Sequence, residues 1–161
     1  MTVTYEPIAT TTLSAGTASV TFSAIPATYT DLVLVFNGTA ASTQAMELRF
    51  NGDTTTNYSA TRLLGESASA ISNRTSTSDV MLVGNLYTTQ TVNIIQVMNY
   101  ANATTFKTVL CRSNNAATQI SVRVGLWRKT PEAITTIFVR PSGAANFSTG
   151  GVFTLYGIKA E

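Results

Sequence analysis

Hydrophobic and polar residues alternate most clearly between residues 31 and 51. The segment Asp31–Asn37 is apolar at successive positions, which favours a central strand covered on both faces. Farther on, Met46, Leu48 and Phe50 alternate with polar residues, which predicts a strand with one dry and one wet face. The residues after Phe50 are Asn, Gly and Asp, which favour a tight turn. We therefore expect a pair of strands at the centre of the protein.

The same pattern continues through the second half of the chain. Apolar runs of strand length recur roughly every dozen residues, a spacing typical of sandwiches and barrels. Gly, Pro, Asn and Ser separate these runs, and no window shows the period of an amphipathic helix. The pattern predicts an all-β protein with one antiparallel β-sandwich of roughly eight to eleven strands.

Residues 120–127 show the most regular alternation. We expect the apolar positions to face the core, so that Arg123 and Trp127 face outward. An outward Trp127 is a candidate contact residue, and the alternative is that it packs under a neighbouring loop. The outward set is Ser121, Arg123, Gly125 and Trp127. The expected core residues are Tyr29, Leu32, Leu34, Phe36, Leu48, Phe50, Val122, Val124, Leu126, Phe153 and Leu155.

Two segments are expected at the periphery. Residues 1–13 are rich in Thr and predict an extended N-terminal arm, which Pro7 confines to an edge or to irregular pairing. Residues 65–78 are rich in Ser and contain one large apolar residue, Ile71, and one base, Arg74. We expect a long surface loop there, either mobile in the isolated subunit or ordered only by a neighbouring chain.

Composition mainly changes the picture of the surface. The 161 residues fit a single domain, 1–161, that is large enough for a real core. Only 11% of the residues are charged, compared with about 25% in an average domain. The net charge of +2 does not indicate a nucleic-acid partner, and no apolar run approaches the ~20 residues of a membrane helix. The N-terminal residues do not have the pattern of a signal peptide.

Residues that carry chemistry are scarce. The chain has no histidine, which removes every Ser-His, Cys-His and His-metal arrangement. Its one cysteine, Cys111, lies in an apolar run and predicts a structural thiol. Glu47 and Asp53 are close in sequence, but a strand face and a turn explain them without glycoside hydrolysis. A Ca²⁺ site could draw oxygens from Asp53, Asn51 and Asn57, but their spacing matches no known calcium loop and the site would carry too little negative charge. We expect no enzymatic activity, no cofactor and no metal.

Four segments together resemble a group of small virion proteins and fibre-tip domains of tailed bacteriophages. The resemblance spans nearly the whole chain and rests on strands and turns. It implies a jelly-roll β-sandwich that is made in the cytoplasm of the host bacterium and incorporated into the virion. The segments are Tyr5–Leu13, Ile25–Leu34, Leu48–Tyr58 and Phe153–Ile158.

The resemblance implies one of two roles. The first is a capsid decoration, or cement, protein: a homo-oligomer, expected as a trimer, that clamps neighbouring subunits of the major capsid protein or other virion proteins. Its expected contact residues are Tyr5, Ile8, Ile71 and Arg74. The alternative is a receptor-binding module of a tail fibre that binds a host surface glycan. Its candidate contact residues are Trp127, Tyr87, Tyr100, Asn99 and Asn102.

Overall fold

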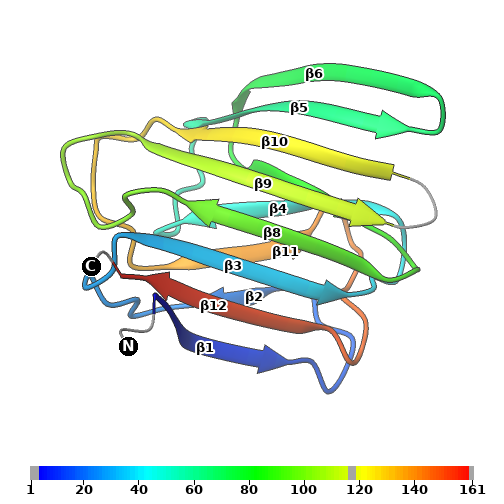
Figure 1. The fold of residues 1–161 in the computed structure, drawn as a ribbon, viewed down its shortest axis with the longest axis horizontal. Helices are drawn as coiled ribbons and strands as arrows, with labels where there is room; N and C mark the ends of the chain where they lie inside the picture. The colour runs from blue at the N-terminus through cyan, green and yellow to red at the C-terminus, as the bar shows by residue number, and fades with distance from the viewer. Residues whose placement is uncertain (1–3, 116–118, 160–161) are drawn as a thin grey trace.

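The computed structural model describes residues 4–115 and 119–159. These residues form twelve β-strands, shown in Figure 1. The strands are β1 (Tyr5–Thr12), β2 (Val20–Phe22), β3 (Asp31–Gly38), β4 (Gln44–Phe50), β5 (Tyr58–Glu66), β6 (Ser69–Ser78), β7 (Met81–Leu86), β8 (Thr91–Val97), β9 (Lys107–Asn115), β10 (Gln119–Trp127), β11 (Ile137–Pro141) and β12 (Val152–Ile158).

The strands form two antiparallel sheets packed face to face. The larger sheet has eight strands in the order β1-β12-β3-β8-β9-β10-β5-β6, and the smaller has four in the order β2-β11-β4-β7. Figure 1 shows the eight-stranded sheet in front and the four-stranded sheet behind it. The predicted fold class, an antiparallel β-sandwich of jelly-roll type, is confirmed.

The core lies between the two sheets. Leu32, Leu34 and Phe36 point inward from β3, and all three are buried. The ring of Phe36 lies 4.6 Å from that of Phe153 and 5.3 Å from that of Phe147, measured between centroids. Strand β3 pairs with β12 on one side and β8 on the other, so the expected central position of this strand is confirmed.

The expectation of a surface loop over residues 65–78 is wrong. These residues form the end of β5 and the strand β6, which pairs with β5 from Glu66 opposite Ser69 to Tyr58 opposite Ser78. A tight turn joins the two strands, with Ser67 at a φ of 53°. Strand β6 gains its order from backbone hydrogen bonds to β5, and an edge strand of this kind needs few buried side chains. This strand raises the total above the expected eleven.

The expected orientation of β10 is also wrong. Arg123 and Trp127 face the four-stranded sheet and are buried, whereas Val122 and Val124 are 42% and 51% exposed. Leu126, another expected core residue, is only half-buried. Trp127 takes the inward position because its indole packs on Phe50 and Tyr58 and finds an acceptor for its N–H group inside the sandwich.

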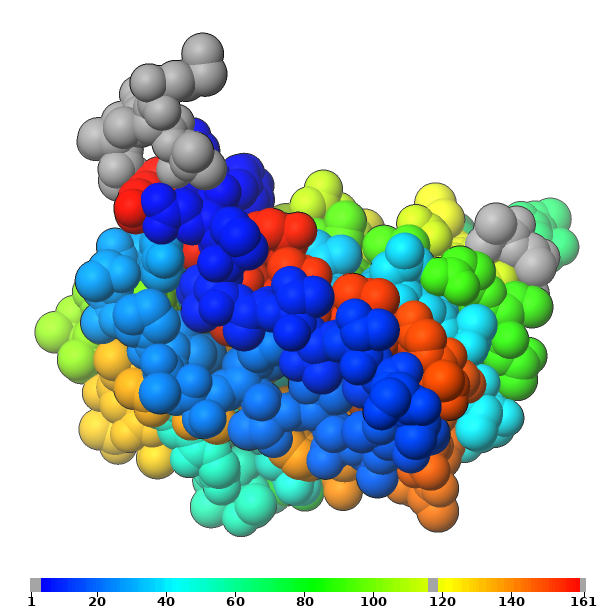
Figure 2. Space-filling view, turned by 90° about the horizontal axis from the view of Figure 1, so that it is seen from below, coloured from blue at the N-terminus to red at the C-terminus, as the bar shows by residue number. Residues whose placement is uncertain are grey.

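The expected N-terminal arm is largely strand β1. It pairs with β12 along residues 5–12, with an irregularity between Pro7 and Ala9. Figure 2, seen from below, shows the N-terminal segment in blue lying over the C-terminal strand in red. Strands β1 and β6 therefore form the two edges of the eight-stranded sheet. The described residues contain no helix that is long and apolar enough to cross a membrane.

Candidate functional site

The outer face of the eight-stranded sheet, the face turned away from the four-stranded sheet, carries a row of apolar side chains. The strand register places Leu63 opposite Val122, and Val122 opposite Arg112 on the next strand. The row continues from Arg112 to Ile94 on β8 and to Val35 on β3. Since directly opposed residues on neighbouring strands share a face, these five side chains form one continuous line across the sheet.

A parallel row runs beside it. Val124 pairs with Thr61 on β5 and with Leu110 on β9, and Leu110 pairs with Gln96 on β8. On the other side of the first row, Ile120 pairs with Asn114 of β9. Apolar side chains from β3, β5, β8, β9 and β10 therefore meet on the outer face, with a few amides among them.

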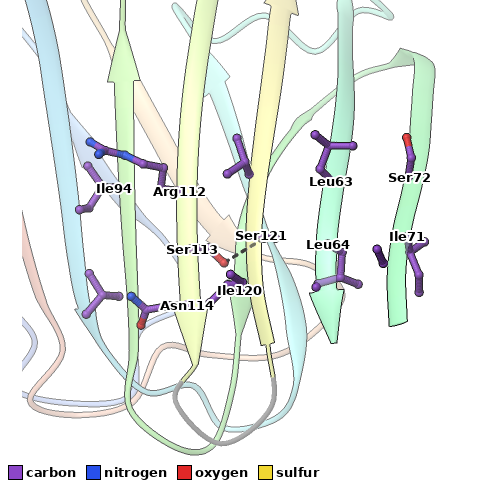
Figure 3. Close-up of a pocket in the computed structure, with 14 residues that line it drawn as sticks. Leu63, Leu64, Ile71, Ser72, Ile94, Arg112, Ser113, Asn114, Ile120 and Ser121 are labelled. Atoms are coloured by element: carbon purple, nitrogen blue, oxygen red, sulfur yellow. Dashed lines mark hydrogen bonds between the residues drawn. The ribbon is translucent and has the colours of Figure 1, made fainter. Parts of the chain in front are cut away.

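These apolar side chains are open to solvent. Ile120 is 68% exposed and Leu63 is 60% exposed. They border a hollow of about 650 Å³ whose walls come from β5, β6, β8, β9 and β10. Figure 3 shows the side chain of Arg112 extending from β9 toward Ile94, with Ile120 and Leu63 on the other side of β9. An exposed apolar area of this kind marks an interaction surface more often than a plain solvated face.

The expected assembly residues lie at opposite ends of the sheet. Tyr5 and Ile8 are on β1, whereas Ile71 and Arg74 are on β6. Tyr5 is 53% exposed, and its ring makes an edge contact with Tyr156. Ile71 is 41% exposed and lines the hollow of the outer face. The structure therefore brings only Ile71 to the candidate site.

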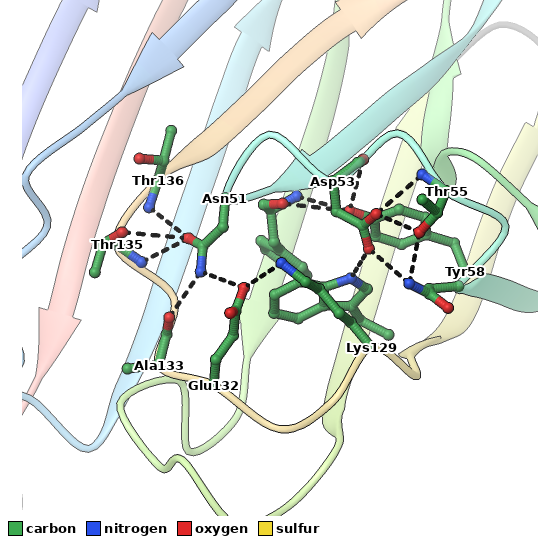
Figure 4. Close-up of polar contacts among 12 residues, drawn as sticks. Asn51, Asp53, Thr55, Tyr58, Lys129, Glu132, Ala133, Thr135 and Thr136 are labelled. Atoms are coloured by element: carbon green, nitrogen blue, oxygen red, sulfur yellow. Dashed lines mark hydrogen bonds and ion pairs between the residues drawn. The ribbon is translucent and has the colours of Figure 1, made fainter.

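Trp127 is not a surface contact residue, because its side chain is only 2% exposed. Its Nε1–H group donates a hydrogen bond of 2.7 Å to Oδ2 of Asp53. The same carboxylate accepts hydrogen bonds from the backbone N–H of Thr55 and from the Asn57 amide, as Figure 4 shows. Trp127 and Asp53 thus hold the turn after β4 against the core.

These hydrogen bonds change the acidity of Asp53. Burial alone raises the pKa of a carboxyl group, but hydrogen bonds from Thr55, Trp127 and Asn57 outweigh it and lower the pKa of Asp53 to about 2. The carboxylate oxygens are therefore already satisfied by protein donors. No cluster of three or more metal-ligating side chains occurs in the part of the chain that the structure describes.

The other glycan candidates are mostly occupied within the fold. Tyr100 is buried, and its hydroxyl donates a hydrogen bond to the carbonyl of Pro26. The side-chain oxygen of Asn102 accepts hydrogen bonds from the backbone of the following turn, and Asn99 holds a turn at a φ of 50°. Tyr87 is half-buried and lines a hollow at the rim between the sheets. It is the one aromatic residue among these candidates that borders a hollow.

Sequence reasoning missed the outer-face residues Leu63, Ile120, Val122 and Val124. The alternation over residues 120–127 is real, but alternation alone does not say which of its two faces is inward. One feature of the sequence does indicate the correct inward face. Trp127 and Gly125 share that face, and a glycine there leaves room for a bulky side chain from the opposite sheet. Met81 fills that room, with its sulfur 2.2 Å from where a side chain on Gly125 would begin.

Comparisons with known proteins give weak likenesses to solved structures and no matching family. No protein-family model matches the chain, and no curated protein matches it. Among solved structures, the chain is similar to a tetrameric galectin from the ball sponge Cinachyrella, with 10% identity over 87% of this chain and 99% of that one, at a TM-score of 0.37. It is also similar to an alginate lyase variant in complex with an alginate tetrasaccharide, with 9% identity over 94% of this chain and 80% of that one, at a TM-score of 0.36. We base no functional argument on likenesses this weak.

Proposed function

We propose that this protein is a non-enzymatic structural protein of a bacteriophage virion, a capsid decoration protein that docks on neighbouring capsid subunits through its outer face. The single observation that carries the docking role is the row of side chains from Leu63 to Val35, apolar except for Arg112, on an uncovered sheet face. The virion assignment rests on the resemblance of four sequence segments to phage proteins.

The chemistry of the outer face favours a protein partner. The fully buried centre of a stable interface is depleted in charge and rich in apolar groups, and the outer face matches this composition. Arg112 is the exception, since it is exposed and has no ion pair among the described residues. We commit to one occupant, which is an apolar patch on the capsid surface with a carboxylate opposite Arg112.

The alternative of a glycan-binding module has less support from the geometry. Sugar rings are commonly stacked on exposed aromatic side chains, but Trp127 and Tyr100 are buried. Aliphatic residues, with Arg112 and Asn114, line the hollow of the outer face, and no aromatic residue does. Tyr87, Asn99 and Asn102 lie outside it.

A coating assay with phage heads tests this function. Purified heads that lack the protein are mixed with the wild-type protein or with Val122→Glu, and bound protein is measured after sedimentation. Val122 is exposed, so the substitution changes the outer face without opening the core. We expect the wild-type protein to coat the heads and Val122→Glu to bind at least about tenfold more weakly. The new carboxylate lies opposite Arg112, so it competes with the capsid carboxylate for that cation and brings a charge into an apolar contact.

Phe106→Glu is the matched control. Phe106 is 54% exposed but lies in the loop before β9, away from the hollow of the outer face. It should coat heads as the wild-type protein does. If Val122→Glu is folded and coats heads as well as Phe106→Glu, the outer face is not the docking surface. Sedimentation of the free protein tests the expected trimer separately.

A further inference from the structure

A second hollow lies on the opposite side of β5 and β10 from the outer face, at the rim between the two sheets. It has a volume of about 270 Å³, and three arginines line it: Arg62 on β5, Arg74 on β6 and Arg123 on β10. We call it the arginine cleft. Figure 1 shows that the β5–β6 hairpin, which forms one wall of the cleft, is at the end of the large sheet.

Arg123 is a buried cation without a carboxylate partner. Arg123 is only 4% exposed. Its Nη2 donates a hydrogen bond of 2.5 Å to the side-chain oxygen of Asn85. Its Nε–H group is buried and has no hydrogen-bond partner. A buried charge is normally paired, because removing it from water costs several kcal/mol that only a close counter-charge or full hydrogen bonding offsets.

A second guanidinium lies directly opposite. Arg62 is the cross-strand partner of Arg123 in the β5–β10 pairing. Its Nε donates a hydrogen bond of 3.2 Å to the side-chain oxygen of Asn73. Two like charges directly opposed on neighbouring strands destabilise a sheet. Burial, together with the charge of Arg62, lowers the pKa of Arg123 to about 10, so Arg123 stays protonated at neutral pH.

The described part of the chain places no acidic side chain in the lining of the arginine cleft. None of the residues that line it is Asp or Glu. The ion pairs found in the described part of the chain join Arg49 to Asp79, Lys129 to Glu132, Arg140 to Glu47 and Lys159 to Glu6. Arg123 and Arg62 are instead each oriented by a neutral amide, Asn85 and Asn73 respectively, which fixes the guanidinium without cancelling its charge.

The cleft opens into a neighbouring hollow of about 470 Å³ that shares Arg62 and Asn85 with it. Amide side chains and Tyr87 line this hollow, together with apolar residues that include Leu64 and Ile71. The side-chain oxygen of Gln119 is buried there without a hydrogen-bond partner. A free acceptor, several amides and one tyrosine are suitable partners for the hydroxyl groups of a sugar. Glu66, which is exposed, is the one acid at this end.

We propose that the arginine cleft binds the carboxylate of an acidic saccharide, with the oxyanion between Arg62 and Arg123 and the sugar hydroxyls in the adjoining hollow. Guanidinium groups hold carboxylates through paired, charge-assisted hydrogen bonds, and the buried, unpartnered Nε–H of Arg123 supplies one such donor. This site is separate from the outer face, since residues 62 and 123 alternate with the outward residues 63 and 122.

Titration followed by NMR tests the site. The probes are a trigalacturonate, the neutral galactotriose, and sodium acetate. We expect the full-length protein to bind trigalacturonate, to bind galactotriose at least about tenfold more weakly, and to bind acetate more weakly than trigalacturonate. Shifted resonances should include the side chains of Arg62, Asn85 and Tyr87. Equal binding of acetate and trigalacturonate would show a simple anion site and overturn the saccharide assignment.

Arg62→Gln is the diagnostic variant, and Arg112→Gln on the outer face is its control with the same change in net charge. Arg62→Gln should weaken trigalacturonate binding about tenfold or more, while Arg112→Gln should leave it unchanged. Without ligand, Arg62→Gln should melt at the same temperature or higher, because it removes a like-charge repulsion. A lower melting temperature together with unchanged binding would mean that the arginines are structural. Absence of binding to the wild-type protein would also overturn the proposal, whatever the coating assay shows.

Discussion

At the scale of single residues, the pair Trp127 and Asp53 explains how the chain closes one end of the sandwich. The indole needs an acceptor once it is buried, and the turn after β4 supplies a carboxylate at 2.7 Å. Thr55 and Asn57 in turn orient that carboxylate. An aspartate in a turn is ordinary from sequence alone, but its partner is 74 residues away, and only the fold brings the two together.

This pair makes stability depend on pH in a defined window. The pKa of Asp53 falls from its ordinary 3.8 to about 2 on folding, so the carboxylate stabilises the protein above pH 3.8. That contribution, about 2 kcal/mol, is lost as the pH falls from about 4 to about 2. Urea unfolding followed by the fluorescence of the single tryptophan should therefore show a steeper loss of stability between pH 5 and pH 2 in the wild type than in Asp53→Asn.

Asp79→Asn is the control for this experiment. It also removes one carboxylate, but the side chain of Asp79 is 50% exposed in its ion pair with Arg49. An exposed pair of this kind contributes between about 0 and 1 kcal/mol. If Asp53→Asn and the wild type show the same pH dependence, the hydrogen bonds to Asp53 do not carry the effect.

At the scale of the elements, strands and breaks are readable from the chain, but the orientation of a strand is not. The run Leu32–Phe36 is apolar at every position, so a prediction that this strand packs in the core is correct whichever face is inward. In β10 a shift by one residue exchanges Val122 for Arg123, and the apolar face is the one that the structure leaves open. Local composition also hid β6, because its order comes from pairing with β5.

The orientation of β10 is testable at Gly125. A methyl group there would begin 2.2 Å from the sulfur of Met81, which is itself buried, so Gly125→Ala should lower the free energy of unfolding by about 1 to 3 kcal/mol. At Gly65 on the neighbouring strand, the nearest atom would lie 3.6 Å away on Ile120. Gly65→Ala should change stability by less than about 0.5 kcal/mol. Urea midpoints that shift equally would contradict the inward position of Gly125.

At the scale of the whole molecule, the sandwich class follows from the spacing of strands, but the hollow of the outer face and the arginine cleft do not. The outer face is built by five strands and the arginine cleft by residues from β4 to β10. Each set becomes a surface only through the order of strands in the sheet, which the sequence pattern does not contain. Tyr5 and Arg74 illustrate the limit, because they were grouped as contact residues and lie on opposite edges.

Cys111 offers a measure of global unfolding. It lies on the central strand β9, is 1% exposed, and burial raises the pKa of its thiol to about 12. Only the unfolded chain should therefore react quickly with a thiol reagent. We expect labelling in native buffer to be at least about a thousandfold slower than in urea, for a stability of about 5 kcal/mol or more. Rapid labelling in native buffer would show that β9 opens locally.

The position of β12 between β1 and β3 has a consequence for synthesis on the ribosome. Tyr5 on β1 and Asp31 on β3 both pair with Ile158 on β12. The backbone of β1 and one edge of β3 therefore remain unpaired until β12 has been translated. During that interval the nascent chain exposes strand edges that another chain can capture. The large sheet is therefore completed only after β12 has been synthesised, and the yield of correctly folded protein should depend on how well the edges of β1 and β3 are shielded until then.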